Sequence, residues 1–524
     1  MDKPTPSNPE PDNTDSYNAG SKQPEQEPLR LQLHPISWLF IIFEMVKNFF
    51  VPILLALLAG GSDSYEFIGA VFVLPAIVFA IVQYAVYRYQ LQPGEIVIRE
   101  GVLFKNVRHV QYRRIQNLNL TRNPLHRLLG VAQLELESAS GGKPEAVMRV
   151  LSMAAVTEIR QKIEQAKQTA MTELESGIAQ AEESKVTEPV ILSLSILELI
   201  KAGLISNKGM VVVAFAFGIL GQTRTLDRFF DRLEVWLEPI LPQVDWGMAH
   251  PLSVVILIFL GLISFVVFIR VLSIIFMLVT YFGFTLKHKG QSLFMQYGLL
   301  TQTQATVPKQ RIQMLSVAES PLHRLFDRIA IRAATAGGNV NQHQQKNAAR
   351  WIAPLIAKQR AQWFIGQIQP QWDLHVQQWQ GVAWRGWRRI FRRDLFILSG
   401  AVLALWFPVQ LWALLVYGLV PISWLHARRS VKAMRYGFSQ NTLVYRSGWL
   451  MRQQSYIPID KIQSLQRKDG PFDRFNNMAT IVVDVAGLDL NRHTVMIRFL
   501  ESEQADQLLD ELYQRVSKTD FVWR

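Results

Sequence analysis

The chain has 524 residues, 49% of them hydrophobic, and a formal net charge of +13, which indicates several domains and more apolar content than an ordinary soluble protein carries. It contains no cysteine, so disulfide bonds, thiolate zinc sites and cysteine nucleophiles are excluded. A basic balance suits nucleic acid or an anionic membrane surface, and the long apolar runs favour the membrane.

The chain begins with a polar segment followed by two apolar runs. Residues 1–30 are rich in Pro, Asn, Ser, Asp and Glu and are predicted to be a disordered tail. Residues 31–88 are predicted to form a transmembrane hairpin, because Ile36–Ala59 and Ile68–Tyr87 are each long enough to cross about 30 Å of hydrocarbon.

The rest of the chain follows the same order twice more. Its predicted segments are a β-rich domain at 89–168, a linker at 169–188, an interfacial helix and second transmembrane hairpin at 189–282, a second β-rich domain at 283–370, a juxtamembrane basic and aromatic segment at 371–393, a third transmembrane hairpin at 394–426 and a third β-rich domain at 427–524. The third hairpin is short and split by Pro408. Because Lys and Arg follow the hairpins while acids dominate the links within them, the β-rich domains are predicted to be cytoplasmic.

The three β-rich domains repeat the same landmarks at the same spacing, which is the strongest signal in the chain. Each domain contains a glycine, an R/K-I-Q-x-L element and a P-[LF]-[HD]-R-[LF] element, in that order. The isoleucine lies 14 residues after the glycine, and the proline lies nine residues after the isoleucine. The positions are Gly101, Ile115 and Pro124; Gly298, Ile312 and Pro321; and Gly448, Ile462 and Pro471. We therefore expect the three isoleucines to be buried in equivalent positions and the glycines to occupy turns or bulges.

Each domain is predicted to end in a helix. We call the three domains copy 1, copy 2 and copy 3 in chain order. In copy 1, Ser152 is expected to be the N-cap. In copy 2 the helix is expected to begin near Pro354, since proline is tolerated in a first turn, and in copy 3 it is expected at Glu501–Val516.

These elements, placed after a transmembrane hairpin, resemble the bacterial membrane-flanked domain, which has a pleckstrin-homology-like (PH-like) fold. Three such units in one chain resemble the YdbT-like family, over about Leu31 to the C-terminus. The resemblance implies an α+β membrane protein, with three transmembrane hairpins each followed by a seven-stranded PH-like β-sandwich capped by a C-terminal helix. It implies no agreed catalytic residue. It also implies a smaller YdbS-like membrane protein as partner, and some relatives are tied to tolerance of membrane-active bacteriocins. Asp473 stands where the other copies have His126 and His323, which puts a role for the histidine in doubt.

The basic residue before each Ile, namely Arg114, Arg311 and Lys461, is a candidate contact for a lipid headgroup or a partner. A solvated strand edge explains such a residue equally simply and is favoured. The histidines of the repeated motif lie in separate domains and do not form a metal ligand set, so a structural role is expected. The chain lacks an H-E-x-x-H or G-x-x-x-x-G-K-[ST] motif, and no enzyme activity and no cofactor are expected.

The basic and aromatic segment before the third hairpin is predicted to be a membrane-surface anchor, with rings at headgroup level and guanidinium groups on phosphates. Nucleic acid is disfavoured because this patch adjoins the bilayer. The anchor residues are Trp384, Arg385, Trp387, Arg388, Arg389, Phe391, Arg392 and Arg393.

Three charged features lie within or beside the apolar runs. Arg270 interrupts a long run and is costly at membrane depth; it is interpreted either as part of a polar pathway, paired with an acid such as Glu44 or Glu198, or as a snorkelling residue at the end of a span. The E-x-x-K pairs Glu44/Lys47 and Glu198/Lys201 put both charges on one helix face, and an interfacial entry helix is favoured over a transport site.

The sequence therefore predicts a non-enzymatic scaffold in the bacterial cytoplasmic (inner) membrane. Its cytoplasmic PH-like domains are expected to bind membrane lipids, the YdbS-like protein or further copies of the chain as a homo-oligomer, with a role in envelope stress or bacteriocin tolerance. The alternative is a transporter or channel component that uses Arg270 and the two E-x-x-K pairs.

Overall fold

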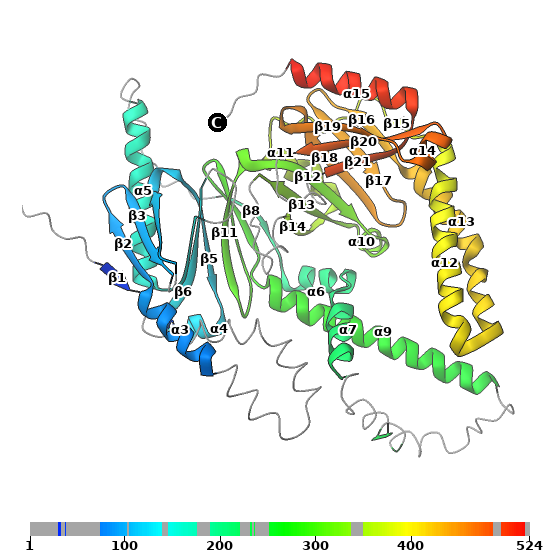
Figure 1. The fold of residues 1–524 in the computed structure, drawn as a ribbon, viewed down its shortest axis with the longest axis horizontal. Helices are drawn as coiled ribbons and strands as arrows, with labels where there is room; N and C mark the ends of the chain where they lie inside the picture. Colours follow the sequence, from blue (N-terminus) through cyan, green and yellow to red (C-terminus); the bar gives the residue numbers. More distant parts are fainter. Residues whose placement is uncertain are drawn as a thin grey trace, which may run out of the picture.

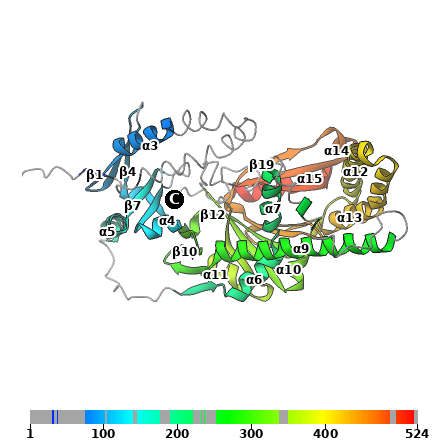
Figure 2. The same ribbon diagram turned by 90° about the horizontal axis from the view of Figure 1, so that it is seen from below.

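The computed structural model describes residues 30–32, 37, 74–101, 104–138, 145–175, 189–220, 231–232, 235, 251–336, 349–485 and 494–518. Three β-rich units follow one another along the chain, with copy 2 between copies 1 and 3 (Figure 1). The view from below shows the same order, with α9 running beneath copies 2 and 3 (Figure 2).

All three copies share one topology, in which four antiparallel strands are followed by three more and then by a helix. Copy 1 consists of β1 (Arg30–Gln32), β2 (Arg88–Gln92), β3 (Glu95–Glu100), β4 (Asn106–Gln111), β5 (Ile115–Arg122), β6 (Val131–Ser138), β7 (Ala146–Ser152) and α5 (Met153–Glu175). Copy 2 consists of β8 (Val190–Ser193), β9 (Thr285–Lys289), β10 (Ser292–Tyr297), β11 (Gln302–Pro308), β12 (Ile312–Glu319), β13 (Arg328–Thr335), β14 (Ala349–Ala357) and α11 (Ala361–Ile368). Copy 3 consists of β15 (Gln380–Gly381), β16 (Arg435–Phe438), β17 (Thr442–Ser447), β18 (Arg452–Pro458), β19 (Ile462–Lys468), β20 (Met478–Val485), β21 (Thr494–Glu501) and α15 (Ser502–Ser517). The expected PH-like unit of seven strands and a helix is confirmed.

The spacing of the landmarks reflects a shared strand register. Ile115, Ile312 and Ile462 each begin the fifth strand of their copy and are 0%, 1% and 2% exposed, so their predicted burial is confirmed. The alternating side chains of the strands beside them fill the core of each sandwich. Because one register is repeated three times, the chain carries three equivalent cores.

The glycine of each copy makes a turn that other residues cannot make. Gly101, Gly298 and Gly448 have φ values of 104°, 113° and 77°, in the region that favours glycine. A Cβ at any of them would overlap the carbonyl oxygen three residues further along the chain. The turn therefore requires glycine for both its backbone angle and its space.

The first strand of each sandwich lies before the membrane segment in the chain, not after it. β1, β8 and β15 pair with β2, β9 and β16, and the apolar segments occupy the chain between the two strands of each pair. The predicted domain boundaries, which began each PH-like domain after its hairpin, assigned these strands to the preceding segments. They are corrected here: each hairpin segment is an insertion between the first two strands of a sandwich.

The membrane helices differ from the three expected hairpins, which are not confirmed. Among the described residues, Phe259–Tyr281 and Gln410–Ala433 are long and apolar enough to cross a membrane. A third span is counted if Ile196–Ile205 and Lys208–Ala216, which meet at a bend of 62°, are taken together. The first hairpin falls largely outside the described residues, where α3 (Leu74–Val86) is its described part.

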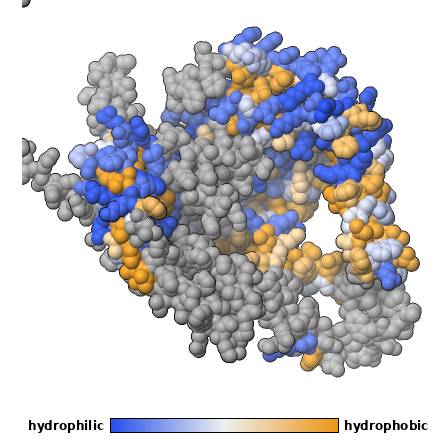
Figure 3. Space-filling model, viewed as in Figure 1, coloured by the Kyte–Doolittle hydropathy of each residue, from blue (hydrophilic) through white to orange (hydrophobic). Residues whose placement is uncertain are grey.

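The second and third membrane segments have well-described helices. In the second, α6 (Ile196–Ile205) and α7 (Lys208–Leu220) pack against α9 (Pro251–Tyr281). In the third, α12 (Trp387–Val409) continues through Pro408, and the chain reverses at Gln410, which has a φ of 49°. Hydrophobic side chains are prominent on the helices at the right of the molecule, whereas the surface of copy 3 above them is mostly hydrophilic (Figure 3).

Three further expectations concern helices. Ser152 accepts a hydrogen bond from the backbone N–H of Ala155 at 3.2 Å, which confirms it as the N-cap of α5, and α15 matches the helix expected in copy 3. The prediction for copy 2 is wrong, because Pro354 lies in β14 and the helix begins at Ala361. Helix α5 extends to Glu175, into the predicted linker.

Neighbouring copies are joined by strand pairing into continuous sheets. β5 of copy 1 pairs with β11 of copy 2, and β12 of copy 2 pairs with β18 of copy 3. Each joint merges the three-stranded sheet of one copy with the four-stranded sheet of the next, which gives two seven-stranded sheets. We call these contacts joint 1 and joint 2. Because open sheet edges do not occur within the hydrocarbon of a bilayer, we expect the three copies to lie on one side of the membrane.

Candidate functional site

The P-[LF]-[HD]-R-[LF] element forms a short capped helix in every copy. These helices are α4 (Pro124–Leu128), α10 (Pro321–Leu325) and α14 (Pro471–Phe475). The Nδ1 atoms of His126 and His323 accept hydrogen bonds from the N-cap backbone N–H groups at 3.2 Å and 3.3 Å, and Asp473 Oδ2 accepts the equivalent bond at 3.2 Å. Burial lowers the pKa of both histidines, which keeps Nδ1 available as an acceptor. The aspartate therefore replaces the histidine as a cap.

The arginine of the same motif ties each copy to the next. Arg127 donates a hydrogen bond to the carbonyl oxygen of Leu299 at 2.9 Å, and Arg324 donates to that of Leu450 at 2.8 Å. Both acceptors lie in the turn that follows the repeated glycine of the next copy. The motif thus builds the joints between domains.

The three candidate headgroup contacts have different surroundings. Arg114 is exposed on copy 1. Arg311 lies in joint 1, where Nη1 is 3.8 Å from Glu137 Oε2 and the side chain is 11% exposed. Lys461 is 3.4 Å from Asp460. Arg311 therefore serves a contact between domains, and the structure does not bring the three together into one site.

The anchor segment lies where α12 meets copy 3. Arg385, Arg388, Arg392 and Arg393 are exposed, while Trp387 and Phe391 pack against the small core formed by copy 3 and α13 (Val420–Ala433). Arg389 forms an ion pair with Asp473, so it holds α12 against the capped helix of copy 3. Four of the predicted anchor arginines thus face outwards, and the fifth has a structural partner.

Arg428 contacts three tryptophan rings of this region. Its guanidinium lies 4.2 Å from the centre of the Trp424 ring, 5.3 Å from Trp387 and 5.7 Å from Trp384, which are cation–π distances. The two helices of the third membrane segment are thereby held together where they leave copy 3. Arg428 was not among the predicted anchor residues, although its spacing of four from Trp424 was a readable signal.

Arg270 binds the bend between α6 and α7. Its Nη1 donates to the carbonyl oxygens of Leu204 and Ser206, both at 3.1 Å, and to Oδ1 of Asn207 at 3.0 Å. A helix end leaves carbonyl groups without partners within the helix, and the guanidinium satisfies them. The partner is thus backbone at a helix break, and the pairing with Glu198 is corrected; Glu44 and Lys47 fall outside the described residues.

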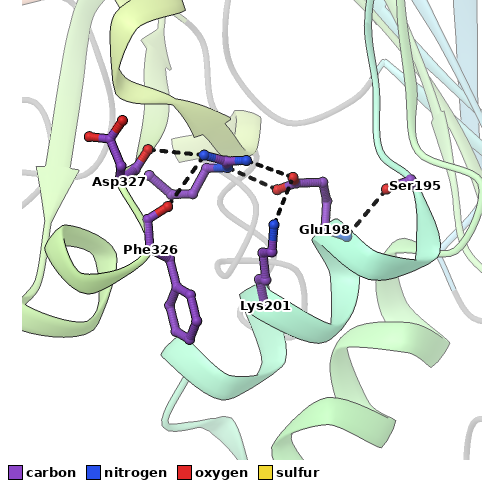
Figure 4. A network of polar contacts seen from close by, with 6 residues as sticks. Ser195, Glu198, Lys201, Phe326 and Asp327 are labelled. Atoms are coloured by element: carbon purple, nitrogen blue, oxygen red, sulfur yellow. Dashed lines mark hydrogen bonds and ion pairs between the residues drawn. The ribbon is translucent and has the colours of Figure 1, made fainter.

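Glu198 joins α6 to copy 2 (Figure 4). Its carboxylate accepts two hydrogen bonds from Arg328 on β13, at 2.9 Å and 3.1 Å, and Lys201 lies 3.5 Å away. Arg328 also donates to the carbonyl oxygens of Phe326 and Asp327. The Glu198/Lys201 pair is therefore part of a network that fixes the membrane helix to the sheet.

A pocket of about 330 Å³ lies where α6, α7 and α9 meet copies 2 and 3. Its apolar walls include Met277 and Tyr281 at the end of the candidate span of α9, together with Trp351 and Leu355 of β14. This position places the pocket at the domain-side end of a membrane helix. One side of it is suited to a hydrocarbon group, and the other side belongs to the PH-like domains.

The charged side chains that line the pocket are mainly cationic. Lys208, Arg332 and Arg452 line it together with one acid, Glu319. The Lys208 Nζ lies 5.4 Å from the ring centre of Tyr281, and the Arg332 guanidinium lies 3.7 Å from that of Trp351. Glu319 is engaged by Lys358 at 2.7 Å and by Arg452 at 3.5 Å. The arrangement can hold an anionic group beside an apolar one.

The sequence did not reveal this pocket, because its lining residues lie far apart in the chain. They come from α6, α7, α9, β12, α10, β13, β14 and the start of β18. Lys208 directly follows the helix break and was the one readable signal. Among the residues that the structure describes, no group of three or more His, Asp or Glu residues could hold a metal ion.

The family model described as "Bacterial PH domain" matches the chain three times, over residues 42–167, 233–372 and 375–516. The chain is also similar to the "UPF0699 transmembrane protein YdbT" of Bacillus subtilis (strain 168), with 23% identity over 475 residues, which covers 88% of this chain and 93% of the relative. No solved structure matches the chain.

Proposed function

The chain belongs to the bacterial PH domain family as a membrane protein with three such domains, and from this premise we propose that it is a non-enzymatic scaffold that binds anionic lipid at the cytoplasmic face of the bacterial inner membrane. The observation that carries the proposal is the pocket between α6, α9 and copies 2 and 3. The basic residues that follow the membrane segments support the cytoplasmic side.

The pocket has the chemistry of a phospholipid site. Lys208 and Arg332 offer cationic groups to a phosphate, and Met277 and Tyr281 continue into the apolar surface of α9. Along that helix, large side chains such as Phe259 and Phe268 are about 60% exposed, as expected of a surface that meets lipid. A phospholipid with its anionic headgroup in the pocket and its acyl chains along α9 would contact both the cationic groups and the apolar surface.

The alternative of a transporter or channel component has weaker support. Arg270 donates hydrogen bonds to the bend between α6 and α7, and Glu198 accepts hydrogen bonds from Arg328. Both residues therefore have partners that explain them without a polar pathway. A role in envelope stress or bacteriocin tolerance, and a smaller YdbS-like protein as partner, remain part of the scaffold proposal.

The test is lipid retention by the full chain. Purified protein is incorporated into nanodiscs of phosphatidylglycerol and phosphatidylcholine, and the bound lipid is counted by native mass spectrometry. Each cationic group near anionic lipid contributes about 1 kcal/mol, so Lys208→Gln with Arg332→Gln is expected to weaken phosphatidylglycerol retention by roughly ten- to thirtyfold.

The control carries the same kind of charge change elsewhere in copy 2. Arg360→Gln lies on the exposed segment before α11, outside the pocket, and is expected to leave retention unchanged. Equal loss in both variants would indicate general surface attraction and would reject the pocket. Unchanged retention in the double variant would reject it as well.

A further inference from the structure

The two joints follow one rule of strand pairing. In joint 1, Gln302 is opposite Arg122, and in joint 2, Arg452 is opposite Glu319. In both, the residue four places after the repeated glycine faces the residue seven places after the repeated isoleucine. The register is the same although the two joints share no strand. The joint is thus a repeated interface with a defined geometry.

The first and third PH-like domains each carry one strand of this interface that has no neighbouring copy among the described residues. In the part of the chain that the structure describes, β4 of copy 1 pairs with β3 alone, and β19 of copy 3 pairs with β20 alone. β4 is equivalent to β11 and β18, and β19 is equivalent to β5 and β12. An open edge presents backbone donors and acceptors that a further strand can pair with.

The side chains of these end strands have the exposure of an unpartnered interface. β12, inside joint 2, is mostly buried, whereas its equivalent β19 is mostly exposed after Ile462. β4 is exposed at five of its six positions, and Val107 is 49% exposed. The same positions are therefore covered wherever a neighbouring copy is present.

Applying the register to the ends brings opposite charges together. Lys105 would face Asp469, as Arg452 faces Glu319 in joint 2, where their side chains lie 3.5 Å apart. Lys105 directly precedes β4, and Asp469 directly follows β19. Opposite charges across a strand pair stabilise the pairing.

A second charge pair follows from joint 1. There Arg311, the residue before the repeated isoleucine, lies 3.8 Å from Glu137. At the two ends, the equivalent of Arg311 is Arg114, which is exposed, and the equivalent of Glu137 is Asp484. The second equivalence follows from the strand register, because Asp484 is opposite Ser464 in β19–β20 and Glu137 is opposite Asn117 in β5–β6. Both charge pairs of the internal joints are thus matched at the ends.

We propose that β4 of one molecule pairs with β19 of a second copy of this chain, which extends the row of PH-like domains from molecule to molecule through a third joint of the same register. The open edges lie on copies 1 and 3, on either side of copy 2 (Figure 1). The exposed Arg474 is the counterpart of Arg127 and Arg324, which bind the next copy in joints 1 and 2.

The test uses disulfide cross-linking in native membranes, because the chain has no cysteine of its own. Directly opposed residues in an antiparallel pair lie about 4.5–5.5 Å apart between Cα atoms, which a disulfide can span. Variants with one cysteine on each edge are oxidised and resolved on denaturing gels. The opposed pairs are Asn106 with Lys468, Val107 with Arg467, and Arg108 with Gln466.

At least one of these pairs is expected to give a ladder of dimers and higher species. The matched control combines Val107→Cys with Tyr513→Cys and should give none, because Tyr513 is 70% exposed on α15 and is not part of the paired strand β19. A chain that stays monomeric with all three opposed pairs, that cross-links within one molecule, or that forms an equal ladder in the control overturns the proposal.

The charge pair gives a second measurement. Lys105→Glu with wild-type Asp469 puts like charges opposite each other and is expected to reduce the cross-linked fraction roughly fivefold. Adding Asp469→Lys restores the attraction and should restore the cross-link. A double variant that is no better than the single one shows that the two residues do not meet.

Discussion

At the residue scale, one side-chain position in each copy decides how a short helix begins. His126 and His323 accept the N-cap hydrogen bond through a neutral ring, and Asp473 accepts it through a carboxylate. Imidazole loses its acceptor at Nδ1 when it is protonated, whereas a carboxylate keeps its acceptor down to much lower pH. The three caps are therefore alike in geometry and different in their response to acid.

This difference predicts a pH dependence. Burial holds the pKa of His323 below its value in the unfolded chain, so the unfolded state binds the proton first as pH falls. Stability is thus present above about pH 6.5 and is lost below it, until the folded-state pKa is reached. Replacing His323 with Asn, whose amide oxygen accepts without titrating, should flatten the melting temperature between pH 7 and 5.5. An unchanged slope would contradict the capping role.

The repeated glycine gives a sharper prediction. Gly298→Ala places a Cβ against the carbonyl of Thr301 at a φ of 113°, and it is expected to cost about 2–4 kcal/mol of stability. The control is Gly366→Ala in α11, where a Cβ meets nothing within 4 Å and should gain up to about 1 kcal/mol. Thermal unfolding in detergent distinguishes the two. Equal effects would mean that the turn tolerates a side chain.

At the element scale, the membrane helices are fastened to the sheets by polar contacts at their ends. Arg328 holds α6 through Glu198, and Arg270 holds the bend between α6 and α7. These polar contacts add to apolar packing, because Leu199 of α6 and Met277 of α9 belong to the same hydrophobic core as the strands of copy 2. The position of the helices relative to the sheets thus depends on both apolar packing and a few charged groups.

The contact between Glu198 and Arg328 can be tested as a pair. The side chains are 24% and 21% exposed, so breaking the pair should cost about 1–3 kcal/mol. Glu198→Gln and Arg328→Gln should each lower the melting temperature, and the double variant should lose little more than either single one. The control pair Lys289–Glu164, about half exposed, should show almost no effect. Additive losses would indicate separate roles.

Some elements could be predicted from the sequence and others could not, for physical reasons. The core strands follow from the fixed distance between Gly298, Ile312 and Pro321, since register is local. β8 could not be found, because four residues at Val190–Ser193 pair with a strand that lies beyond the whole membrane segment. Asparagine side chains are mostly exposed in proteins, yet Asn117 and Asn119 are buried and donate hydrogen bonds to Glu137. The pocket could not be predicted for the same reason, because its lining residues come from elements that are far apart in the chain.

At the scale of the whole molecule, the two joints link the three PH-like domains through continuous sheets, and we therefore expect all three domains on one side of the membrane. Because β8 and β9 belong to one sheet, we expect the segment between them to cross the bilayer an even number of times. The same holds for the segments between β1 and β2 and between β15 and β16. Bent or paired helices satisfy this condition, and a single crossing does not.

The side of the membrane can be measured with matched positions. Leu128, Leu325 and Phe475 occupy the same place in the three motifs and are 82%, 74% and 87% exposed. Single cysteines there should be protected from an impermeant maleimide in spheroplasts and labelled after permeabilisation. Labelling of all three in spheroplasts would place the domains outside. A mixed result would contradict the continuous sheets.

The position of each membrane segment inside a sandwich also has a consequence for biosynthesis. As the chain is made, Val190–Ser193 leaves the ribosome long before its partner Thr285–Lys289, and the segment between them must first be threaded into the bilayer and brought back. A chain that fails to return leaves the two strands in different compartments and its sandwich unfinished, with apolar strands open to proteases. Completion of each sandwich therefore depends on the return of its membrane segment to the side on which the first strand lies.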